Sequence, residues 1–473
     1  MSVASLKTGE LIMNEQYHFI LPERPYQNLD EYYQEKREAL SKSRSMSPEE
    51  IIKELKTSQL RGRGGGGFLT GQKWQTLYED PCETKYVVIN AAEGEPGTFK
   101  DRMVMRKNPF AMIEGALIAA YVLGTSEIYI CIKGSFHQEM DRLYGAIEDF
   151  KKKGLLQGIN INLVAGPEDY LYGEEKAMLN VIEGIGPLPR EAHYPPYIMG
   201  LFSTPTSSNP ALINNVETYA RVPQILLRGA ESFASIGTEA TTGPFICTVS
   251  GDVQKEGVFE ITPGMTLREL LYEYAQGPRP GREFKAILNG VASAVITSDH
   301  LDVKLDYNEM AKIGSWLGSC SFIVYDDERS AVRIAQEAAL FLYDESCNQC
   351  PACKGGLRVS SNHIDSLFTP EQDSSVLQHI VNGAKSAPRE NRCYLPVQGS
   401  VLIPSLMNAF QEEFEALLGN KGPIPPKVIL PKIVDYLKQT SRFVLKEDDF
   451  DERPRQAPWE ESRFFLDRQS YTR

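Results

Sequence analysis

The chain has 473 residues, of which 42% are hydrophobic and 24% charged, and its formal net charge is −13. A chain of this length and ordinary globular composition is expected to form about three domains with substantial cores. The acidic balance excludes nonspecific nucleic-acid binding, because that activity needs a basic surface.

No segment is expected to cross a membrane or to direct export. The most apolar stretch, residues 110–124, is interrupted by Glu114 and is too short for a membrane-spanning helix. The N-terminus lacks the charged and then apolar pattern of a signal peptide. We therefore expect a cytoplasmic chain in a reducing compartment, without a direct membrane span.

The first 46 residues are polar and mixed in character, and we expect them to form an arm that wraps a neighbour. A helix is expected to begin after Ser47, because this residue is a suitable N-cap, Pro48 fits the first turn and Glu50 completes a capping box. The helix is expected to end near Ser58, shortly before a run of glycines.

Between residues 85 and 183, short apolar runs alternate with amphipathic stretches. The expected strands are 85–90, 127–132 and 160–164, and the expected helices are 108–124, 136–153 and 174–183. Strands that alternate with helices predict an α/β domain with a parallel sheet covered on both faces. Residues 185–210 are rich in Pro and Ser and are expected to be a loop.

Beyond residue 240 the pattern changes. Strand-like runs at 245–249 and 258–261 predict a hairpin; a short helix from Thr266 and strands at 284–288 and 321–325 then suggest a small β-grasp domain. Residues 330–440 are expected to be mostly helical, and the charged tail 441–473 is expected to be extended. The expected domains are therefore 1–46, 47–240, 241–328, 329–440 and 441–473.

Four cysteines of the helical segment carry the strongest chemical signal. Cys347, Cys350 and Cys353 are spaced for one tight turn, and Cys393 follows at a distance. Three thiols in one loop and a distant fourth suit a cubane iron–sulfur cluster. Zinc is the alternative, although structural zinc sites usually take two separated Cys-x-x-Cys pairs.

A disulfide framework is disfavoured, because 8 cysteines in 473 residues are far fewer than small secreted scaffolds contain. The other four are expected to be small buried apolar residues; they are Cys82, Cys131, Cys247 and Cys320.

The glycine-rich segment formally matches a dinucleotide fingerprint at Gly62, Gly64 and Gly67. The fingerprint requires a preceding strand, whereas a helix is expected here, so the usual Rossmann placement is rejected. Consecutive glycines still expose backbone N–H groups to a ligand. With the positive charge of Arg61, Arg63 and Lys73 nearby, the segment predicts a phosphate-bearing ligand, the alternative being a flexible linker.

Two acidic loops follow expected strands, at residues 90–98 and 170–175, so both are expected at the carboxyl edge of the sheet where ligands bind. Carboxylates there would accept hydrogen bonds from sugar hydroxyls and repel a 2′-phosphate, which favours NADH over NADPH. The alternative is a pair of solvated charge runs. Asn214 and Asn215 suit either a polar ring or phosphate, or a helix cap.

Taken together, these segments resemble the NADH-binding flavoprotein subunit of respiratory complex I and of related diaphorases. The resemblance covers roughly residues 15–430 in collinear order. It is carried by motifs at 61–74, 90–98, 173–175, 214–218 and 345–353, and by the late Cys393.

This resemblance implies a Rossmann-like FMN domain, a β-grasp domain and a helical bundle with a [4Fe-4S] cluster, which pass electrons from NADH to partner subunits. Phe68 and Tyr197 would stack on NADH, Glu95 and Glu175 would contact its nicotinamide and ribose ends, and the four cysteines named above would hold the cluster. The residues implied to line FMN are Gly62, Gly64, Lys73, Asn90, Glu93, Tyr170, Gly173, Glu174, Asn214, Asn215 and Thr218.

The chain departs from the family pattern on the nucleotide side. Ala92 stands where many members carry Asp, and Thr76 replaces an aromatic residue expected near the adenine. Residues 189–196 are altered, and 206–213 carry an apparent insertion. These changes leave open a redox-inert scaffold that has lost nucleotide binding.

The implied partners are a small thioredoxin-like [2Fe-2S] subunit, since no such segment precedes residue 47, and a larger iron–sulfur or catalytic subunit. The resemblance fits a cytoplasmic location, or a peripheral one on a membrane complex. A diaphorase subunit of an NAD-linked hydrogenase, a formate dehydrogenase or an electron-bifurcating complex remains an alternative.

Overall fold

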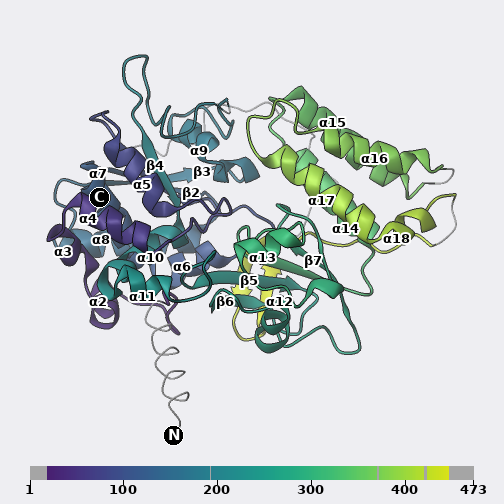
Figure 1. The fold of residues 1–473 in the computed structure, drawn as a ribbon, viewed down its shortest axis with the longest axis horizontal. Helices are drawn as coiled ribbons and strands as arrows, with labels where there is room; N and C mark the ends of the chain where they lie inside the picture. Colours follow the sequence, from purple (N-terminus) through teal and green to yellow (C-terminus); the bar gives the residue numbers. More distant parts are fainter. Residues whose placement is uncertain (1–18, 192, 370–371, 420–422, 447–473) are drawn as a thin grey trace, which may run out of the picture.

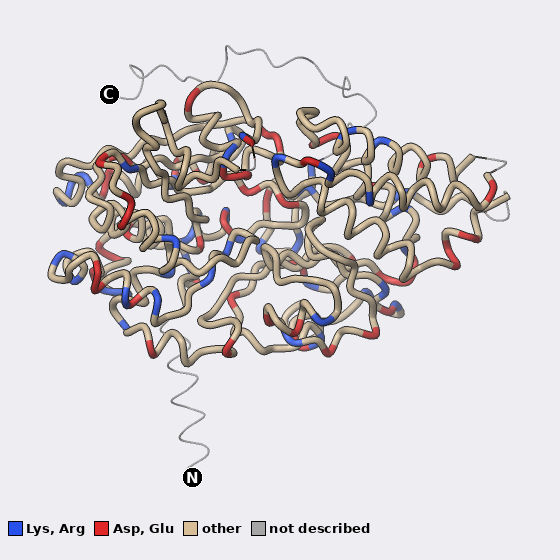
Figure 2. Tube along the Cα trace, turned by 45° about the horizontal axis from the view of Figure 1, so that its top comes forward, with Lys and Arg blue, Asp and Glu red and all other residues tan. Residues whose placement is uncertain are grey.

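A computed structural model describes residues 19–191, 193–369, 372–419 and 423–446. Figure 1 shows the parallel-sheet domain on the left, a second sheet at the lower centre and a helical bundle at the upper right. Figure 2 shows acidic and basic residues interspersed along the chain, with both signs present in the interior where these parts meet. Among the described residues, no helix combines the length and apolar character needed to cross a membrane.

The first domain is built on a parallel sheet, as the alternating pattern predicted. The strand order of this sheet is β3-β2-β1-β4. Its strands are β1 (Tyr86–Ala91), β2 (Glu127–Lys133), β3 (Asn160–Gly166) and β4 (Ala211–Asn215). Side chains alternate across each strand, so β1 presents Val87 and Ile89 to one core and Val88 to another.

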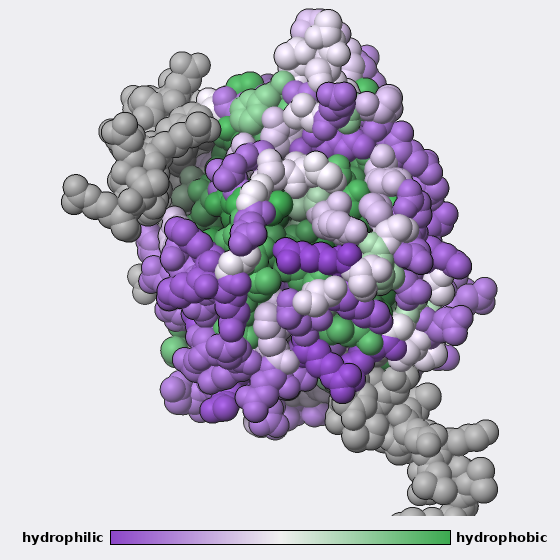
Figure 3. All heavy atoms as spheres, turned by 90° about the vertical axis from the view of Figure 1, so that its left-hand side faces the viewer, coloured by the Kyte–Doolittle hydropathy of each residue, from purple (hydrophilic) through white to green (hydrophobic). Residues whose placement is uncertain are grey.

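Helices cover both faces of this sheet. One face packs against α7 (Pro109–Leu123), α8 (His137–Lys152) and α10 (Val216–Arg228), and the other packs against α9 (Glu175–Ile182). The expected caps of α7 are present, because the Asn108 side chain accepts from Ala111 N and Gly124 ends the helix in a left-handed conformation. From the side shown in Figure 3, this domain is largely hydrophilic at its rim, with apolar residues visible towards its middle.

The sequence analysis missed several elements around the site. They include α5 (Thr70–Glu79) after the glycines, α6 (Lys100–Lys107) after the first acidic loop, α10, and β4, part of which was assigned to an insertion. The expected capping-box helix is present as α4 (Pro48–Thr57). A short α11 (Ala230–Ala234) closes the domain.

The described part of the N-terminal segment packs on its own domain. Residues 19–46 include α2 (Leu29–Lys36) and α3 (Ala39–Arg44), whose apolar residues join the core of the parallel-sheet domain. Tyr32 is fully buried against Phe110, and Glu114 of α7 accepts hydrogen bonds from Tyr32 Oη and from Ala39 N. The charge that interrupts the apolar helix therefore anchors this segment.

The second sheet has the order β6-β5-β9-β7-β8 and includes the predicted antiparallel hairpin. Its strands are β5 (Phe245–Gly251), β6 (Gly257–Ile261), β7 (Phe284–Asn289), β8 (Ile296–Thr297) and β9 (Ser321–Asp326). The helical segments α12 (Leu267–Glu269), η2 (Leu270–Tyr274), η3 (Ser298–His300) and α13 (Tyr307–Lys312) connect them. Strands β5 and β9 pair in parallel, and together these elements enclose a separate apolar core.

The helical bundle comprises α14 (Ala331–Asp344), α15 (Pro351–Ser366), α16 (Ser375–Ser386), α17 (Leu395–Ala409) and α18 (Gln411–Ala416). Residues 330–440 are mostly helical, as expected, but the last described helix ends at Ala416, and the described start of the tail is an extended strand that pairs with the end of this range. Strands β10 (Ile433–Leu437) and β11 (Arg442–Leu445) form an antiparallel hairpin, and its Phe443 is buried against Phe99. Residues 447–473 of the expected tail lie outside the described part.

Candidate functional site

A cavity of about 200 Å³ lies at the carboxyl edge of the parallel sheet. Both acidic loops reach it, as the positions of their strands predicted. The second sheet and the helical bundle also contribute to its wall. Its lining residues include Gly64, Asn90, Ala92, Glu93, Gly94, Glu95, Thr98, Lys100, Asp101, Tyr170, Leu171, Gly173, Glu174, Asn215, Ser319, Cys393, Tyr394, Leu395 and Gln398.

The glycine-rich loop runs between α4 and α5, so a helix and not a strand directly precedes it, and the rejection of the usual Rossmann placement is confirmed. The loop closes through Gly62 N, which donates to Phe68 O at 2.8 Å. A Cβ at Gly64 would lie 3.1 Å from Asn215 Cβ, and Gly67 has a φ of 62°. The glycines therefore bring backbone close to the end of β4.

The positive charges expected beside these glycines are engaged by groups of the protein itself. Arg63 is buried and donates to the carbonyls of Thr242 and Pro244. Arg61 donates to Ala240 O and to Gly67 O of the loop, and Lys73 Nζ lies 2.6 Å from Glu175. The guanidinium groups satisfy backbone carbonyls at the domain junction, which the sequence pattern does not reveal.

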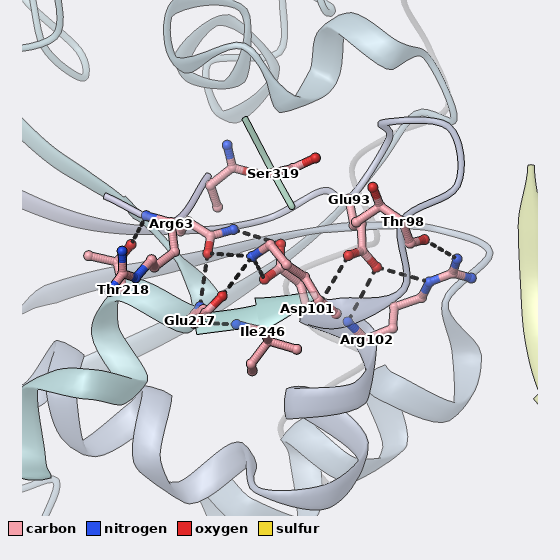
Figure 4. Close-up of polar contacts among 12 residues, drawn as sticks. Arg63, Glu93, Thr98, Asp101, Arg102, Glu217, Thr218, Ile246 and Ser319 are labelled. Atoms are coloured by element: carbon pink, nitrogen blue, oxygen red, sulfur yellow. Dashed lines mark hydrogen bonds and ion pairs between the residues drawn. The ribbon is translucent and has the colours of Figure 1, made fainter. Parts of the chain in front are cut away.

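Lys100 supplies the cation on the cavity wall, and the sequence analysis missed it. Its Nζ donates to Asp101 Oδ1 at 2.8 Å, Glu217 Oε2 at 3.2 Å and Asn215 Oδ1 at 3.3 Å (Figure 4). Burial lowers the pKa of Lys100, but the two carboxylates outweigh burial and raise it. Burial raises the pKa of Asp101 to about 6. Lys100 and these two carboxylate residues therefore form a fixed cluster of opposite charges at the cavity wall.

Glu95 accepts hydrogen bonds from two different parts of the chain. Tyr170 Oη donates to its Oε2 at 2.6 Å, and Val291 N of the second sheet donates to its Oε1 at 2.6 Å. Burial raises the pKa of Glu95, and these two hydrogen bonds partly offset that rise. Gln398 of α17 donates to Tyr170 Oη at 2.7 Å. One hydrogen-bonded chain thus joins all three domains at the cavity.

The remaining lining groups are held by the backbone. Glu174 caps α9 by accepting from Ala177 N, and burial raises its pKa to about 7. Glu93 accepts from Asp101 N and from Arg102 Nε. Asn90 Nδ2 donates to Gly173 O at 2.8 Å. Their side chains are ordered before any ligand binds.

Other predicted residues surround the cavity without lining it. Gly62 closes the glycine loop, Thr218 accepts from Arg63 N, and the amide of Asn214 lies 3.0 Å from Trp74 Nε1. Phe68 is 59% exposed and Tyr197 is 44% exposed, so both rings are accessible to a planar ligand. Lys73 and Glu175 form a part-buried ion pair with each other.

The four motif cysteines line a second, smaller cavity, so the distant thiol is brought to the other three. Cys350 precedes α15 and Cys353 lies in its first turn, whereas Cys393 precedes α17. Burial raises the pKa of Cys353 to about 11 and that of Cys393 to about 12. Bound metal would favour the thiolate forms.

All eight cysteines are free. Within the described ranges, no three His, Cys, Asp or Glu side chains are arranged to hold a single metal ion. Soft sulfur ligands around a cavity fit a group that is larger than one ion, as an iron–sulfur cluster is. Of the remaining cysteines, Cys131, Cys247 and Cys320 are buried as predicted, whereas Cys82 is partly exposed.

The two cavities adjoin, because Leu171, Cys393 and Leu395 line both of them. The larger cavity also fits a polar planar ligand. Gln398 Oε1 is buried there and, within the described part of the chain, has no hydrogen-bond partner. A Cβ at Gly173 would lie 3.1 Å from Ala92 O, so the lack of a side chain at this position leaves room at the cavity wall.

Comparison with known proteins agrees with this geometry. The Nuo51 FMN-binding domain model matches residues 55–224, and the model of the NADH-ubiquinone oxidoreductase-F iron-sulfur binding region matches residues 333–417. The F 2 subunit of the NADH-quinone oxidoreductase of Rhizobium meliloti (strain 1021) is 36% identical over 379 residues, which are 78% of this chain and 89% of that protein. The F subunit of the same enzyme in Aquifex aeolicus (strain VF5) is 34% identical over 407 residues, with 84% and 93% covered.

Among solved structures, a chain of an NAD+-reducing [NiFe]-hydrogenase in the H2-reduced state superposes with a TM-score of 0.74 at 25% sequence identity. The match covers 80% of this chain but only 65% of the hydrogenase chain. About a third of that longer chain therefore has no counterpart in the match.

Proposed function

The chain belongs to the family of the F subunit of NADH-quinone oxidoreductase, and from this premise we propose that it oxidises NADH and passes the electrons through FMN and a [4Fe-4S] cluster to partner subunits. FMN supplies the chemistry that converts a two-electron hydride donor into a source of single electrons, and the cluster carries those electrons one at a time.

The shared wall of the two cavities is the observation that carries this proposal. Cys393 lines the candidate flavin cavity and also the cavity among the four thiols. A group held by these sulfurs would lie directly behind the wall of the flavin cavity. The arrangement suits electron transfer between two adjacent cofactors, and an isolated structural site would have no use for it.

The protein's own contribution is binding, orientation and exclusion of water. We assign the flavin to the cavity lined by Gly64, Asn90, Glu93, Gly173 and Asn215. The other family positions retained in this proposal are Gly62, Lys73, Tyr170, Glu174, Asn214 and Thr218.

NADH is proposed to approach from the side of the exposed Phe68 ring, with Tyr197 as the second stacking residue. Glu95 and Glu175 would orient its nicotinamide and ribose ends. Glu95 is part-buried and accepts two hydrogen bonds, whereas the Glu175 side chain is 43% exposed, which matches a deeper and a shallower end of one binding groove.

We assign FMN and NADH to residues 47–240, the β-grasp role to 241–328 and the cluster to 329–440. A small thioredoxin-like [2Fe-2S] subunit and a larger iron–sulfur or catalytic subunit would receive the electrons in a peripheral assembly. A diaphorase role in an NAD-reducing hydrogenase is the second candidate, which the structural similarity favours specifically.

Anaerobic purification of the full chain with its partners tests the proposal. We expect bound FMN, iron and sulfide in the ratio of one [4Fe-4S] cluster, and bleaching of the flavin absorbance by NADH. Bound flavin that neither NADH nor NADPH bleaches would instead support the redox-inert scaffold, and zinc without iron would contradict the cluster. The identity of the co-purified subunits separates the complex I role from the hydrogenase role.

A further inference from the structure

The chain returns from the helical bundle as a strap, residues 425–446, that contacts all three domains. Arg333 of α14 donates to Pro425 O at 3.0 Å, and Tyr325 of β9 donates to Ile429 O at 3.1 Å. Phe443 N donates to Glu256 Oε2 at 2.8 Å. The strap therefore includes the β10–β11 hairpin and fastens the bundle and the second sheet.

On the first domain, the strap meets the acidic loop that lines the flavin cavity. Gly97 N of that loop donates to Pro431 O at 2.8 Å. Arg102 donates to Ile433 O at 2.5 Å and to Val434 O at 3.2 Å. Arg106 pairs with Asp435. The acidic loop and both ends of α6 are thus tied to the strap, the loop just before β10 and the helix at β10 itself.

Arg102 also reaches the cavity lining. Its Nε donates to Glu93 Oε2 at 3.3 Å, and both side chains are almost fully buried, at 5% and 3% exposure (Figure 4). A guanidinium presents its donors in a rigid fork, so one group can hold strap carbonyls and a carboxylate in a fixed relation. Glu93, in turn, lines the flavin cavity.

Phe99 links the hairpin to the same guanidinium from the side. The Arg102 guanidinium stacks 4.2 Å from the Phe99 ring centroid, and that ring lies 5.7 Å from the Phe443 ring of β11. Together with Ile433, these rings form a small separate apolar cluster. Displacement of Phe443 would therefore reach Arg102 without altering any residue of the cavity.

We propose that the strap is a positioning element of the flavin site and that Arg102 transmits its position to Glu93. This inference rests on the proposed binding of FMN. When Arg102 is lost, the buried Glu93 carboxylate lacks its cation, so a negative charge beside the flavin is no longer compensated. Flavin affinity and the flavin midpoint potential should then both fall, because a reduced flavin carries additional negative charge.

The test uses the full chain with its partners and four variants. Arg102→Met removes the cation. Arg102→Lys keeps the positive charge but lacks the planar set of guanidinium N–H donors. Phe443→Ala loosens the hairpin, and Leu437→Ala is its control, because this hairpin residue is 44% exposed and lies outside the apolar cluster. Iron content and far-UV circular dichroism report whether each variant folds.

We expect Arg102→Met to weaken FMN binding by roughly tenfold, as loss of a hydrogen bond to a charged group does, and to lower the midpoint potential. Arg102→Lys should recover the potential but not the full affinity. Phe443→Ala should weaken FMN binding, and the double variant Arg102→Met, Phe443→Ala should bind FMN no more weakly than Arg102→Met alone. Leu437→Ala should bind FMN normally.

Additive effects in the double variant would overturn the inference, because the hairpin would then act independently of Arg102. An unchanged potential in Arg102→Met would overturn it as well. Should Arg102→Met fail to fold, normal FMN affinity and potential in Phe443→Ala would still refute the strap's role. A wild-type chain that contains the cluster and binds no FMN would instead contradict the proposed function itself.

Discussion

Substitution of Tyr170 by Phe probes the hydrogen-bonded chain that joins the three domains. The change removes one hydroxyl, which donates to Glu95 at 2.6 Å and accepts from Gln398 at 2.7 Å. The ring itself packs edge-on against Phe341, with centroids 5.3 Å apart, and this contact is kept. The experiment therefore isolates the hydrogen bonds from the packing.

A hydrogen bond to a charged group contributes about 1.5 to 3 kcal/mol to stability. Glu95 retains the bond from Val291 N after the substitution. Burial already raises the pKa of Glu95, and loss of the hydroxyl should raise this pKa further, because the ionised form loses one of its two donors. Where Glu95 is ionised, the variant should therefore be less stable by about 1.5 to 3 kcal/mol.

The deficit should depend on pH in a defined direction. Because the folded-state pKa of Glu95 is above its unfolded value and rises further in the variant, folding is penalised as the carboxyl ionises. Below the unfolded pKa both proteins hold the proton and the deficit is small. The stability deficit should grow as the pH rises through the folded-state pKa of Glu95 in the wild type, and it should be complete above the folded-state pKa of Glu95 in the variant.

Urea unfolding of both proteins between about pH 5 and 9 measures this dependence. Tyr121→Phe is the control, because Tyr121 Oη donates to the Met46 carbonyl and no carboxylate is involved. The KM for NADH should show an acid limb displaced to higher pH in Tyr170→Phe if ionised Glu95 orients the nicotinamide. A deficit that is constant with pH, as expected for the control, would refute the coupling between Tyr170 and Glu95.

Three further predictions address the cluster, the coenzyme and the N-terminal segment. Cys350→Ala and Cys393→Ala should lose iron and destabilise the helical bundle, whereas Cys82→Ala should keep its iron; unchanged iron in the first two would reject the ligand assignment. Glu175→Ala should relax discrimination against NADPH, measured as the ratio of kcat/KM for the two coenzymes, and an unchanged ratio would exclude this role. Burial raises the pKa of Glu114 from 4.5 to about 7, so the stability of the wild-type protein should fall by about 3 kcal/mol as the pH rises through this interval. Glu114→Gln should remove this pH dependence in unfolding experiments, and a pH dependence that persists in the variant would contradict the role of Glu114.

The sequence predicted the elements whose local signals agree with their environment. Strands β1 and β2 are apolar runs buried in the parallel sheet, β3 is a part-buried apolar run at its edge, and α7 carries both of its caps. Strand β4 was missed because it offers only three apolar residues before two asparagines, and its pairing with β1 supplies what propensity does not. The β10–β11 hairpin was missed for a similar reason, since its five- and four-residue strands depend on contacts with distant segments.

The site could be predicted only where its residues follow a strand or a recognisable motif. The acidic loops and the four cysteines are of this kind. Lys100, Ser319 and Gln398 come from three different domains, and no local pattern distinguishes them from ordinary polar residues. The position of Arg61 and Arg63 next to glycines suggests phosphate binding, whereas each donates to a carbonyl that lies 179 residues away in sequence, a separation that only the fold reveals.

Assembly of the cavity from three domains has a consequence for electron transfer. Glu95 is held by Val291 of the second sheet, and its partner Tyr170 is held by Gln398 of α17, the helix that Cys393 precedes. The groups that shape the flavin cavity are thus the same groups that fix the distance from that cavity to the fourth thiol. A shift of the helical bundle would therefore disturb flavin binding and the separation of the two cofactors together, because close-packed elements do not deform independently. If the proposed function holds, contacts that fasten the domains to each other would therefore contribute to the rate at which electrons leave the flavin.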